Sequence, residues 1–306
     1  MNIIETIISN QLIPPVLYHY TSPSRFIDIV EGRCLLAFNL QHIKNNDSFE
    51  YTIELVEKEL REQLKHKSRL LRTKGKHDGT GKQIKLLSEL TKRLSELARF
   101  HIFIVSLTQD GDAKSSWQDY CPKGIGVSIG FDAAHLNELA QQQGFILAGC
   151  CHTRREQENA VKALIGESVD KIKTEDKNAS EWLLTLNNTA DEFATKTVQL
   201  AALFKHPHCS EKSEWRLLAM PTPILPTNSS IRFMGNDLMP APYLKFMLSD
   251  NTGMASLIPK VIIGPAPDKK LSRGSLELFL SARALESITI THSRIPYSSH
   301  GQVGKS

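Results

Sequence analysis

The chain has 306 residues, of which 41% are hydrophobic and 23% charged, the proportions of an ordinary globular protein. No apolar run approaches the roughly 20 residues that a membrane-spanning helix needs, and the first residues lack the pattern of a secretory signal peptide. Five cysteines without regular spacing indicate free thiols in a reducing compartment rather than a disulfide framework. These features argue against membrane-embedded and disulfide-rich secreted classes and predict a cytoplasmic protein.

The first predicted elements are a strand and a short helix, joined by a polar and aromatic cluster. Leu12, Ile13, Val16 and Leu17 form an apolar, strand-like run that leads into L-Y-H-Y-T-S-P. The apolar spacing that follows predicts a helix ending at Gly32. A histidine between two tyrosines at a strand end indicates either a solvent-facing terminus or a ligand site. This stretch alone does not decide between them.

Residues 50–99 form the most basic part of the chain. Their leucine spacing predicts a helix over 50–72, a glycine-containing turn and a second helix around 87–97. Residues 57–99 carry thirteen Lys or Arg against six Asp or Glu, whereas the net charge of the whole chain is only +4. We expect an inserted basic helical hairpin that contacts nucleic acid, or else a merely solvated helical face. The acids among the lysines and the scarcity of aromatic residues favour the second interpretation.

After residue 100 the periodicity alternates between strands and helices without a regular βαβ repeat. Strands are predicted around 101–108, 125–132, 214–220, 231–234, 241–248, 259–265 and 287–297, and helices over 115–121, 132–140, 154–204 and 271–285. This mixture predicts an α+β fold. We interpret residues 1–306 as one domain with two insertions, the hairpin at 50–99 and a helical segment at 152–205.

Three motif-like stretches do not carry the chemistry that they suggest. The glycines of 124–130 lie within a strand instead of opening a helix, so they are not a dinucleotide fingerprint. The K-H-D-G-T-G-K turn lacks the ending of a phosphate-binding loop. The third stretch combines cysteines and histidines but has no C-x-x-C pair, so we predict no metal site. Its members are Cys150, Cys151, His152, His206, His208 and Cys209.

A series of short motifs in fixed order resembles a large group of uncharacterised bacterial proteins. The motifs run from about residue 17 to 297. They are H-Y-T-S (19–22), N-D (46–47) followed by Glu50, S-L-T (106–108), W-x-x-Y (117–120), G-V-x-I-G-F-D (126–132), Lys205, E-W-R (214–216), I-I-G-P (262–265) and S-x-I-x-Y (293–297). That group in turn is similar to the ADP-ribosyltransferase superfamily in its H-Y-E arrangement, which implies a split β-sheet core.

The resemblance implies an enzyme that uses NAD as a substrate and transfers ADP-ribose to a protein or nucleic acid, as a toxin or anti-phage effector. It assigns the catalytic roles to His19, Tyr120 and Glu214. His19 binds a ribose hydroxyl, Tyr120 stacks on the nicotinamide, and Glu214 grips the nicotinamide-side ribose. The remaining residues expected to contact NAD are Tyr20, Thr21, Ser106, Trp117 and Arg216.

These residue types suit the cleavage of a glycosidic bond. Breaking the bond between nicotinamide and ribose creates positive charge on the sugar, and a carboxylate bound to the ribose 2′-hydroxyl stabilises that charge. Arg216 either binds the pyrophosphate or holds Glu214 in position. Lys212 stands where the superfamily often carries a second acid, so activation of the acceptor is not explained. The alternatives are an NAD glycohydrolase and a non-catalytic module that binds a partner through the hairpin.

Overall fold

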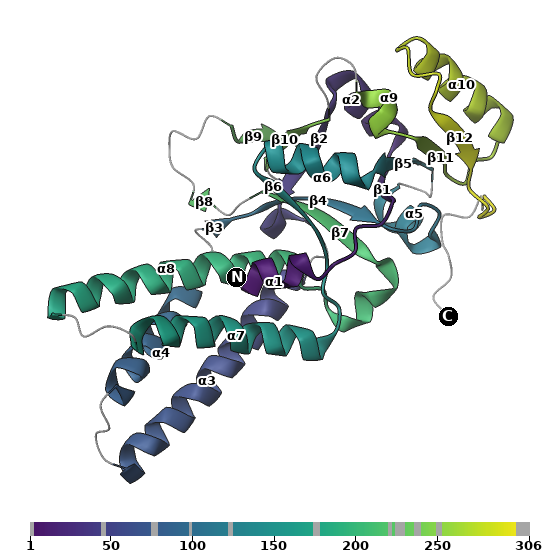
Figure 1. The fold of residues 1–306 in the computed structure, drawn as a ribbon. Helices are drawn as coiled ribbons and strands as arrows, with labels where there is room; N and C mark the ends of the chain where they lie inside the picture. The colour runs from purple at the N-terminus through teal and green to yellow at the C-terminus, as the bar shows by residue number, and fades with distance from the viewer. Residues whose placement is uncertain are drawn as a thin grey trace.

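The computed structural model describes residues 3–43, 47–74, 79–97, 100–121, 125–173, 178–219, 222–223, 230–235, 240–248 and 253–297. Within these ranges a ten-stranded, mostly antiparallel sheet lies beside a bundle of four long helices (Figure 1). The predicted α+β class is confirmed. None of the described helices is both long enough and apolar enough to cross a membrane.

The sheet has the strand order β12-β11-β5-β1-β4-β2-β10-β9, and β7 branches from β4 to pair with β6. Among the described strands of this sheet, β11 and β12 form the one parallel pair. The ten strands are β1 (Val16–Thr21), β2 (Cys34–Asn39), β4 (Phe103–Thr108), β5 (Val127–Asp132), β6 (Phe145–Gly149), β7 (Glu214–Ala219), β9 (Arg232–Met234), β10 (Ala241–Met247), β11 (Lys260–Ile263) and β12 (Thr289–His292). The short strands β3 (Phe100–His101) and β8 (Thr222–Pro223) pair separately.

The sheet nearly divides between its two central strands. β1 pairs with β5 along its whole length, and β4 pairs with β7 from Thr108 to Ile104. Between β1 and β4, however, only Tyr18 and Thr108 are paired. The two strands therefore diverge beyond this point, and side chains occupy the wedge where ladder hydrogen bonds would otherwise form.

One face of the sheet is covered by short helices. Side chains of α2 (Pro23–Gly32), α6 (Ala133–Gln142), α9 (Met254–Leu257) and α10 (Lys269–Ser281) bury a core with the inward residues of the strands. Ser22 caps α2, because its Oγ accepts a hydrogen bond from Arg25 N at 3.3 Å. The hydroxyl of the H-Y-T-S motif thus begins the helix that follows β1.

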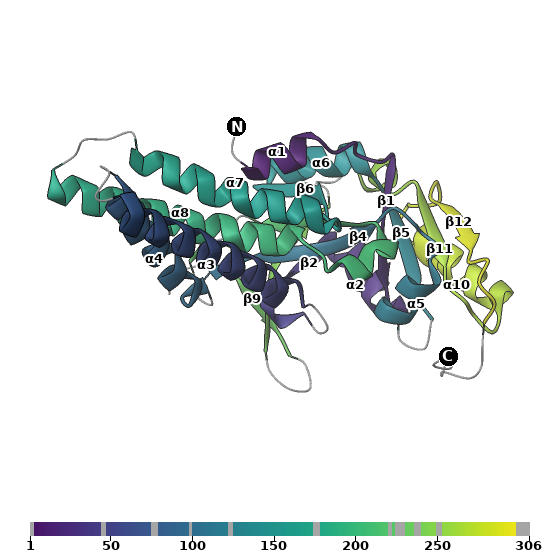
Figure 2. The ribbon, with the colours of Figure 1, turned by 90° about the horizontal axis from the view of Figure 1, so that it is seen from below.

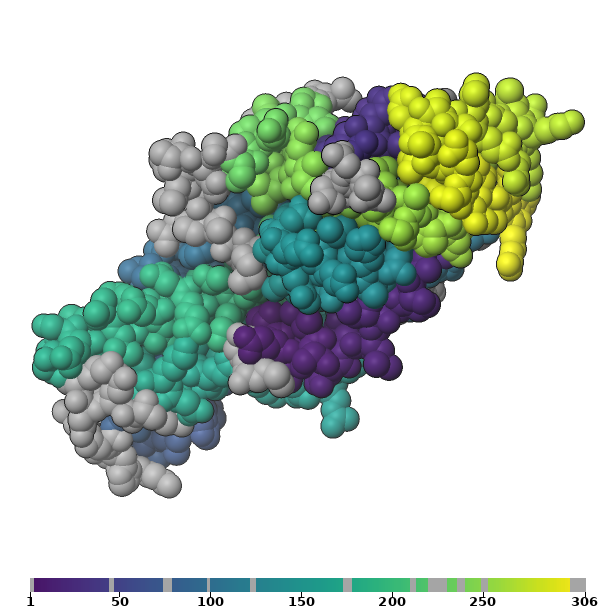
Figure 3. Space-filling model, turned by 45° about the horizontal axis from the view of Figure 1, so that its top comes forward, coloured from purple at the N-terminus to yellow at the C-terminus, as the bar shows by residue number. Residues whose placement is uncertain are grey.

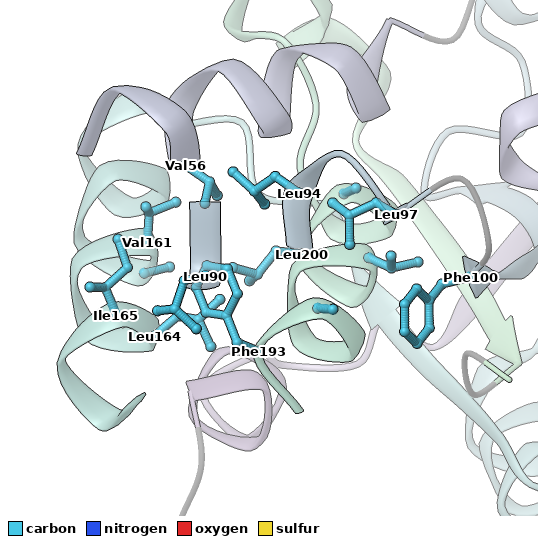
Figure 4. Close-up of a cluster of buried hydrophobic side chains, with 14 of the residues drawn as sticks. Val56, Leu90, Leu94, Leu97, Phe100, Val161, Leu164, Ile165, Phe193 and Leu200 are labelled. Atoms are coloured by element: carbon cyan, nitrogen blue, oxygen red, sulfur yellow. The ribbon is translucent and has the colours of Figure 1, made fainter. Parts of the chain in front are cut away.

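The opposite face carries the four-helix bundle of α3 (Ser48–Lys74), α4 (Thr80–Leu94), α7 (Arg154–Lys173) and α8 (Ala179–Leu203). Leu90, Leu164 and Phe193 meet at its centre, each from a different helix (Figure 4). α4 and α8 run in the same direction, because Lys85 contacts Trp182 and Arg93 pairs with Asp191, 3.3 Å apart. Both helices therefore begin at the same end of the bundle.

The bundle is continuous with the sheet at one end and projects from it at the other (Figures 2 and 3). Ile104, Ala148 and Leu218, from β4, β6 and β7, belong to the same buried cluster as the bundle core. The segments 50–99 and 152–205, which the sequence presents as two separate insertions, thus pack together as one helical unit.

The structure corrects the start of the first strand. β1 begins at Val16, and Leu12 and Ile13 are 93% and 42% exposed. Pro14 and Pro15 explain the difference, since proline has no amide hydrogen for a strand ladder. The structure also contains two helices and three strands that the periodicity did not identify. These are α1 (Ile3–Ser9), α9, β2, β6 and β8.

Candidate functional site

A small recess lies where β1 and β4 diverge, and His19, Ser106, Tyr120 and Glu214 all line it. They come from β1, β4, α5 (Lys114–Tyr120) and β7 respectively. The recess has a volume of about 30 Å³, enough for one or two water molecules. Its other lining residues are Tyr18, Tyr20, Leu107, Thr108 and Ser116.

Glu214, the first residue of β7, is only 4% exposed and has three polar neighbours. Its Oε1 accepts hydrogen bonds from Arg216 Nε at 2.7 Å and from Ser106 Oγ at 3.0 Å. Lys205 Nζ lies 2.9 Å from Oε2. Burial by itself would raise the pKa of Glu214, but the charges of Arg216 and Lys205 outweigh it and hold the pKa at about 2. The carboxylate is ionised at neutral pH.

The second oxygen of this carboxylate retains hydrogen-bonding capacity. Lys205 Nζ lies 2.9 Å from Oε2 and lowers the pKa of the carboxyl, and no second donor to this buried atom is present among the described residues. A carboxylate oxygen can accept two hydrogen bonds, so an oxygen with one donor keeps capacity for another. The carboxylate, which lines the recess, is therefore suited to accept a hydrogen bond from a ligand hydroxyl or a water molecule.

Arg216 links Glu214 to the end of α8 in the helical bundle. Its side chain is 1% exposed, and its Nη1 donates to the carbonyl oxygen of Ala202 at 2.6 Å, in the last turn of α8. The carbonyls of a helix C-terminus lack partners within the helix and favour a cation. Arg216 does not line the recess, so of its two expected roles the structure favours holding Glu214 over binding pyrophosphate.

Lys205 comes from the bundle side of the same junction. It follows α8, its amide donates to Cys151 O at 3.0 Å, and its carbonyl accepts from Gln157 Nε2 at 2.7 Å. These contacts fix its backbone against α7 and leave the ammonium to reach Glu214. The sequence placed a lysine near the E-W-R strand but gave it no role.

His19 spans the wedge between the diverging strands. Its Nδ1 lies 3.0 Å from the carbonyl oxygen of Ser106, which only accepts hydrogen bonds, so Nδ1 carries the proton. Burial lowers the pKa of His19, and the hydrogen bond to Ser106 opposes this only in part. The neutral ring therefore presents Nε2 as a hydrogen-bond acceptor.

Tyr120 is the most exposed of the four central residues, at 41%. It lies at the end of α5, and burial of its hydroxyl together with the nearby charge of Glu214 raises its pKa. The phenol thus stays neutral, with its hydroxyl near the carboxylate and part of its ring open to solvent. An exposed aromatic ring at the mouth of a recess is suited to stack on a flat ligand.

Trp117 is buried beneath the recess rather than lining it. Its Nε1 donates to Asp112 Oδ1 at 2.9 Å, and Ser293 Oγ reaches the same oxygen at 2.5 Å. Its ring packs on Gly264, where an added Cβ would come within 2.8 Å of it. The W-x-x-Y, I-I-G-P and S-x-I-x-Y motifs thus meet here, and Trp117 anchors the helix that carries Tyr120.

Tyr20 lines the recess and also contacts the helix that carries Tyr120. The Tyr20 ring stands edge-on to Trp117, with centroids 4.6 Å apart, and its hydroxyl donates to Asp110 O at 2.9 Å. The same hydroxyl accepts from Ala113 N at 2.8 Å, which fixes the loop before α5. Thr21 is buried and does not line the recess. Of the eight residues proposed from the sequence, Thr21, Trp117 and Arg216 lie outside the recess lining.

The cysteine and histidine segment lies beside the carboxylate without forming a metal centre. Cys150 N donates to Glu214 O at 2.8 Å, and burial raises the pKa of the Cys150 thiol to about 12, so the sulfur is protonated. Burial also lowers the pKa of His152. In the part of the chain that the structure describes, no three His, Cys, Asp or Glu side chains are arranged to hold a metal ion.

Residues 116–217 are similar to a protein family described as "Protein of unknown function (DUF2971)". The matched segment spans 102 of the 306 residues and includes Tyr120, Lys205 and Glu214, but neither His19 nor Ser106. No curated protein and no solved structure matches the chain.

Proposed function

We propose that this protein is an NAD-dependent ADP-ribosyltransferase that modifies a macromolecule, a protein or a nucleic acid. One observation carries the proposal. The ionised Glu214 carboxylate, whose Oε2 has Lys205 as its one donor among the described residues, lines a recess that is also lined by neutral His19 and by Tyr120.

The three side chains suit the separate needs of this reaction. Nicotinamide leaves as its bond to ribose C1′ breaks, and the acceptor nucleophile forms the new bond at the same carbon. Glu214 Oε2 accepts a hydrogen bond from the ribose 2′-hydroxyl and stabilises the positive charge that develops on the sugar. His19 Nε2 accepts from a hydroxyl of the other ribose, and the Tyr120 ring stacks on the leaving group.

The residues around Glu214 keep its carboxylate charged and in a fixed position. A carboxylate with a pKa of about 2 is charged throughout the neutral range, whereas a protonated acid would not stabilise a cation. Arg216, Lys205 and Ser106 hold the group in a fixed position, so little reorganisation is needed when charge develops.

The recess is smaller than the nicotinamide ring that it would have to bind. A volume of about 30 Å³ does not hold a nicotinamide ring, so the ligand enters only if a wall moves. Tyr120 is the residue best placed to move, because it is 41% exposed and lies at the end of a seven-residue helix. Binding of NAD is thus expected to reposition Tyr120.

An NAD glycohydrolase is the second candidate, and it differs only in using water as the acceptor. Lys212 occupies the position of the superfamily's acceptor-activating acid, which favours an acceptor that needs no such acid. A water molecule that binds the Glu214 carboxylate in the recess would meet this condition.

The experiment is to incubate the protein with NAD labelled on its adenylate portion and with a bacterial extract, and then to separate protein, nucleic acid and small molecules. Transfer predicts label on one macromolecular fraction, and hydrolysis predicts free ADP-ribose. Glu214→Gln abolishes either product, whereas Glu167→Gln retains it, because Glu167 pairs with Lys196 between α7 and α8 and does not line the recess. If the wild-type protein yields neither product and NAD does not raise its melting temperature, the protein is not an enzyme of this class.

A further inference from the structure

The basic charge of the helical hairpin is concentrated at the end of the bundle farthest from the sheet. The described residues 63–73 and 79–88 contain six Lys or Arg and no acid. The described parts of α7 and α8 at this end, residues 168–173 and 178–188, are balanced, with two acids and two lysines. The exposed cations whose side chains the structure describes are Lys65, Arg69, Arg72, Lys82 and Lys85.

An open recess of about 520 Å³ lies at this end, between the first turns of α4 and α8. Lys82 and Lys85 line one side of it, and Trp182 and Leu183 line the other. Lys85 Nζ lies 4.6 Å from the centre of the Trp182 ring, and Leu183 is 48% exposed. The recess thus combines two cations with an apolar, aromatic wall.

The indole nitrogen of Trp182 is a further indication that this recess binds a ligand. Its indole Nε1 is buried but donates no hydrogen bond to the described residues. A buried indole N–H ordinarily has an acceptor. The aromatic side chain that the basic segment 57–99 lacks for base stacking is supplied here by α8, from a distant part of the sequence.

We propose that this end of the bundle binds single-stranded nucleic acid, with a base held against Trp182 and Leu183 and its phosphates on Lys82 and Lys85. Stacking on an aromatic side chain inside a positively charged groove is the usual way to bind single strands without sequence preference. The exposed cations Lys65, Arg69 and Arg72 of α3 extend the phosphate path. A volume of about 520 Å³ is in the range of pockets that bind small organic ligands, so it accommodates a nucleotide.

An anionic membrane surface shares the charge but fits the shape less well. Membrane-binding surfaces present a continuous apolar face with cations along its border. Here Lys82 and Lys85 lie within a hollow, on the wall opposite Trp182. The site is also separate from the Glu214 recess, since the 25 residues of α8 place the two ends of that helix roughly 37 Å apart. The inference does not depend on the proposed NAD chemistry.

The test is the binding of a fluorescein-labelled single-stranded oligonucleotide of 12 nucleotides to the full-length protein at several salt concentrations. We expect the affinity to fall steeply with salt. In the double variant Lys82→Gln/Lys85→Gln the affinity at fixed salt falls about tenfold, and the slope of log K against log salt decreases by about 1.4, the loss of two phosphate contacts. The matched control is Lys58→Gln/Lys92→Gln, which removes two charges from the part of the same hairpin near the sheet and leaves binding unchanged.

Tryptophan fluorescence locates the bound strand. Trp117 and Trp215 are 1% and 4% exposed, so quenching by the oligonucleotide reports mainly on Trp182. Quenching that disappears in the lysine double variant supports the proposal. Equal affinity of the double variant and the wild type overturns it, as does equal loss in the control. Binding to vesicles containing anionic lipid, with no binding to the oligonucleotide, overturns it in favour of a membrane surface.

Discussion

Charged side chains are buried and paired at one end of α8 but exposed at the other. At the sheet end, Arg216, Lys205 and Glu214 are buried and paired with one another, and Arg216 also binds the last turn of the helix. At the far end, Lys82 and Lys85 are exposed beside Trp182, and neither has an acidic partner among the described residues.

The buried charged groups at the sheet end stabilise the fold, whereas the exposed lysines at the far end are available to bind a ligand. Removing one partner of a buried pair leaves the others in a medium that solvates them poorly, so the free energy of unfolding falls by several kcal/mol. Removing an exposed charge changes stability little, because water already solvates it. Removing a charge at the sheet end should therefore lower the free energy of unfolding far more than removing one at the far end. For the binding of nucleic acid the order should be the opposite, with the larger loss at the far end.

The largest effect is expected for Arg216→Met. It leaves the buried Glu214 carboxylate with Lys205 as its only cation and removes the donor to Ala202 O. The free energy of unfolding should fall by about 3–5 kcal/mol, measured by denaturant titration. Arg154→Met is the control, since Arg154 pairs with Glu158 on an exposed helix face and its loss should not change the unfolding midpoint. Similar behaviour of the two variants would show that the junction is not held by buried charge.

Lys205→Gln should have the next largest effect, about 2 kcal/mol at pH 7, from the loss of a charged partner of Glu214. Because the pKa of Glu214 is lower in the folded state than its usual 4.5, its contribution to stability is complete above pH 4.5 and is lost as the pH falls toward 2. The variant raises the folded pKa, so stability should depend less on pH across this window. A pH dependence identical to that of the wild type would contradict the assigned role.

Tyr120→Ala should affect ligand binding far more than stability. The residue is 41% exposed, so its truncation should change the free energy of unfolding by less than about 1 kcal/mol. Loss of stacking should weaken NAD binding by about 1 kcal/mol, or roughly fivefold, measured by calorimetry. Tyr120→Phe keeps the ring and should restore the affinity. If the phenylalanine variant binds as poorly as the alanine variant, the hydroxyl and not the ring is what matters.

The smallest effect on stability is expected for Lys82→Gln/Lys85→Gln. Both side chains are exposed, so the unfolding free energy should stay within about 0.5 kcal/mol of the wild type. A large loss of stability would mean that these lysines support the packing of α4 on α8, and the two ends of the bundle would no longer differ as described.

Local patterns predicted most of the long helices and the strands with strong alternation. The periodicity of 50–72 corresponds to α3, and the E-W-R strand corresponds to β7. The brief apolar stretches of β2 and β6 were missed because a run of five or six residues fits a buried helix segment as well as a strand.

What the sequence could not provide was the long-range packing. Nothing in residues 50–99 or 152–205 separately indicates that they share one core, because each predicted only its own amphipathic face. Lys205 was visible as a motif residue, but its contact with Glu214 depends on the way α8 ends on the sheet. The contact between Trp182 and Lys85 could likewise not be predicted, since 97 positions separate the two residues in the sequence. The structure places His19, Tyr120 and Glu214 around one recess, and the roles that the resemblance implies for them stay predictions.

The most direct test of the proposed site is the release of nicotinamide from NAD by the purified protein, followed by chromatography. We predict release by the wild type and by Glu167→Gln, and none by Glu214→Gln that remains folded by circular dichroism. Release by the folded Glu214→Gln variant at the wild-type rate would show that this carboxylate does not stabilise the transition state. It would contradict the central claim.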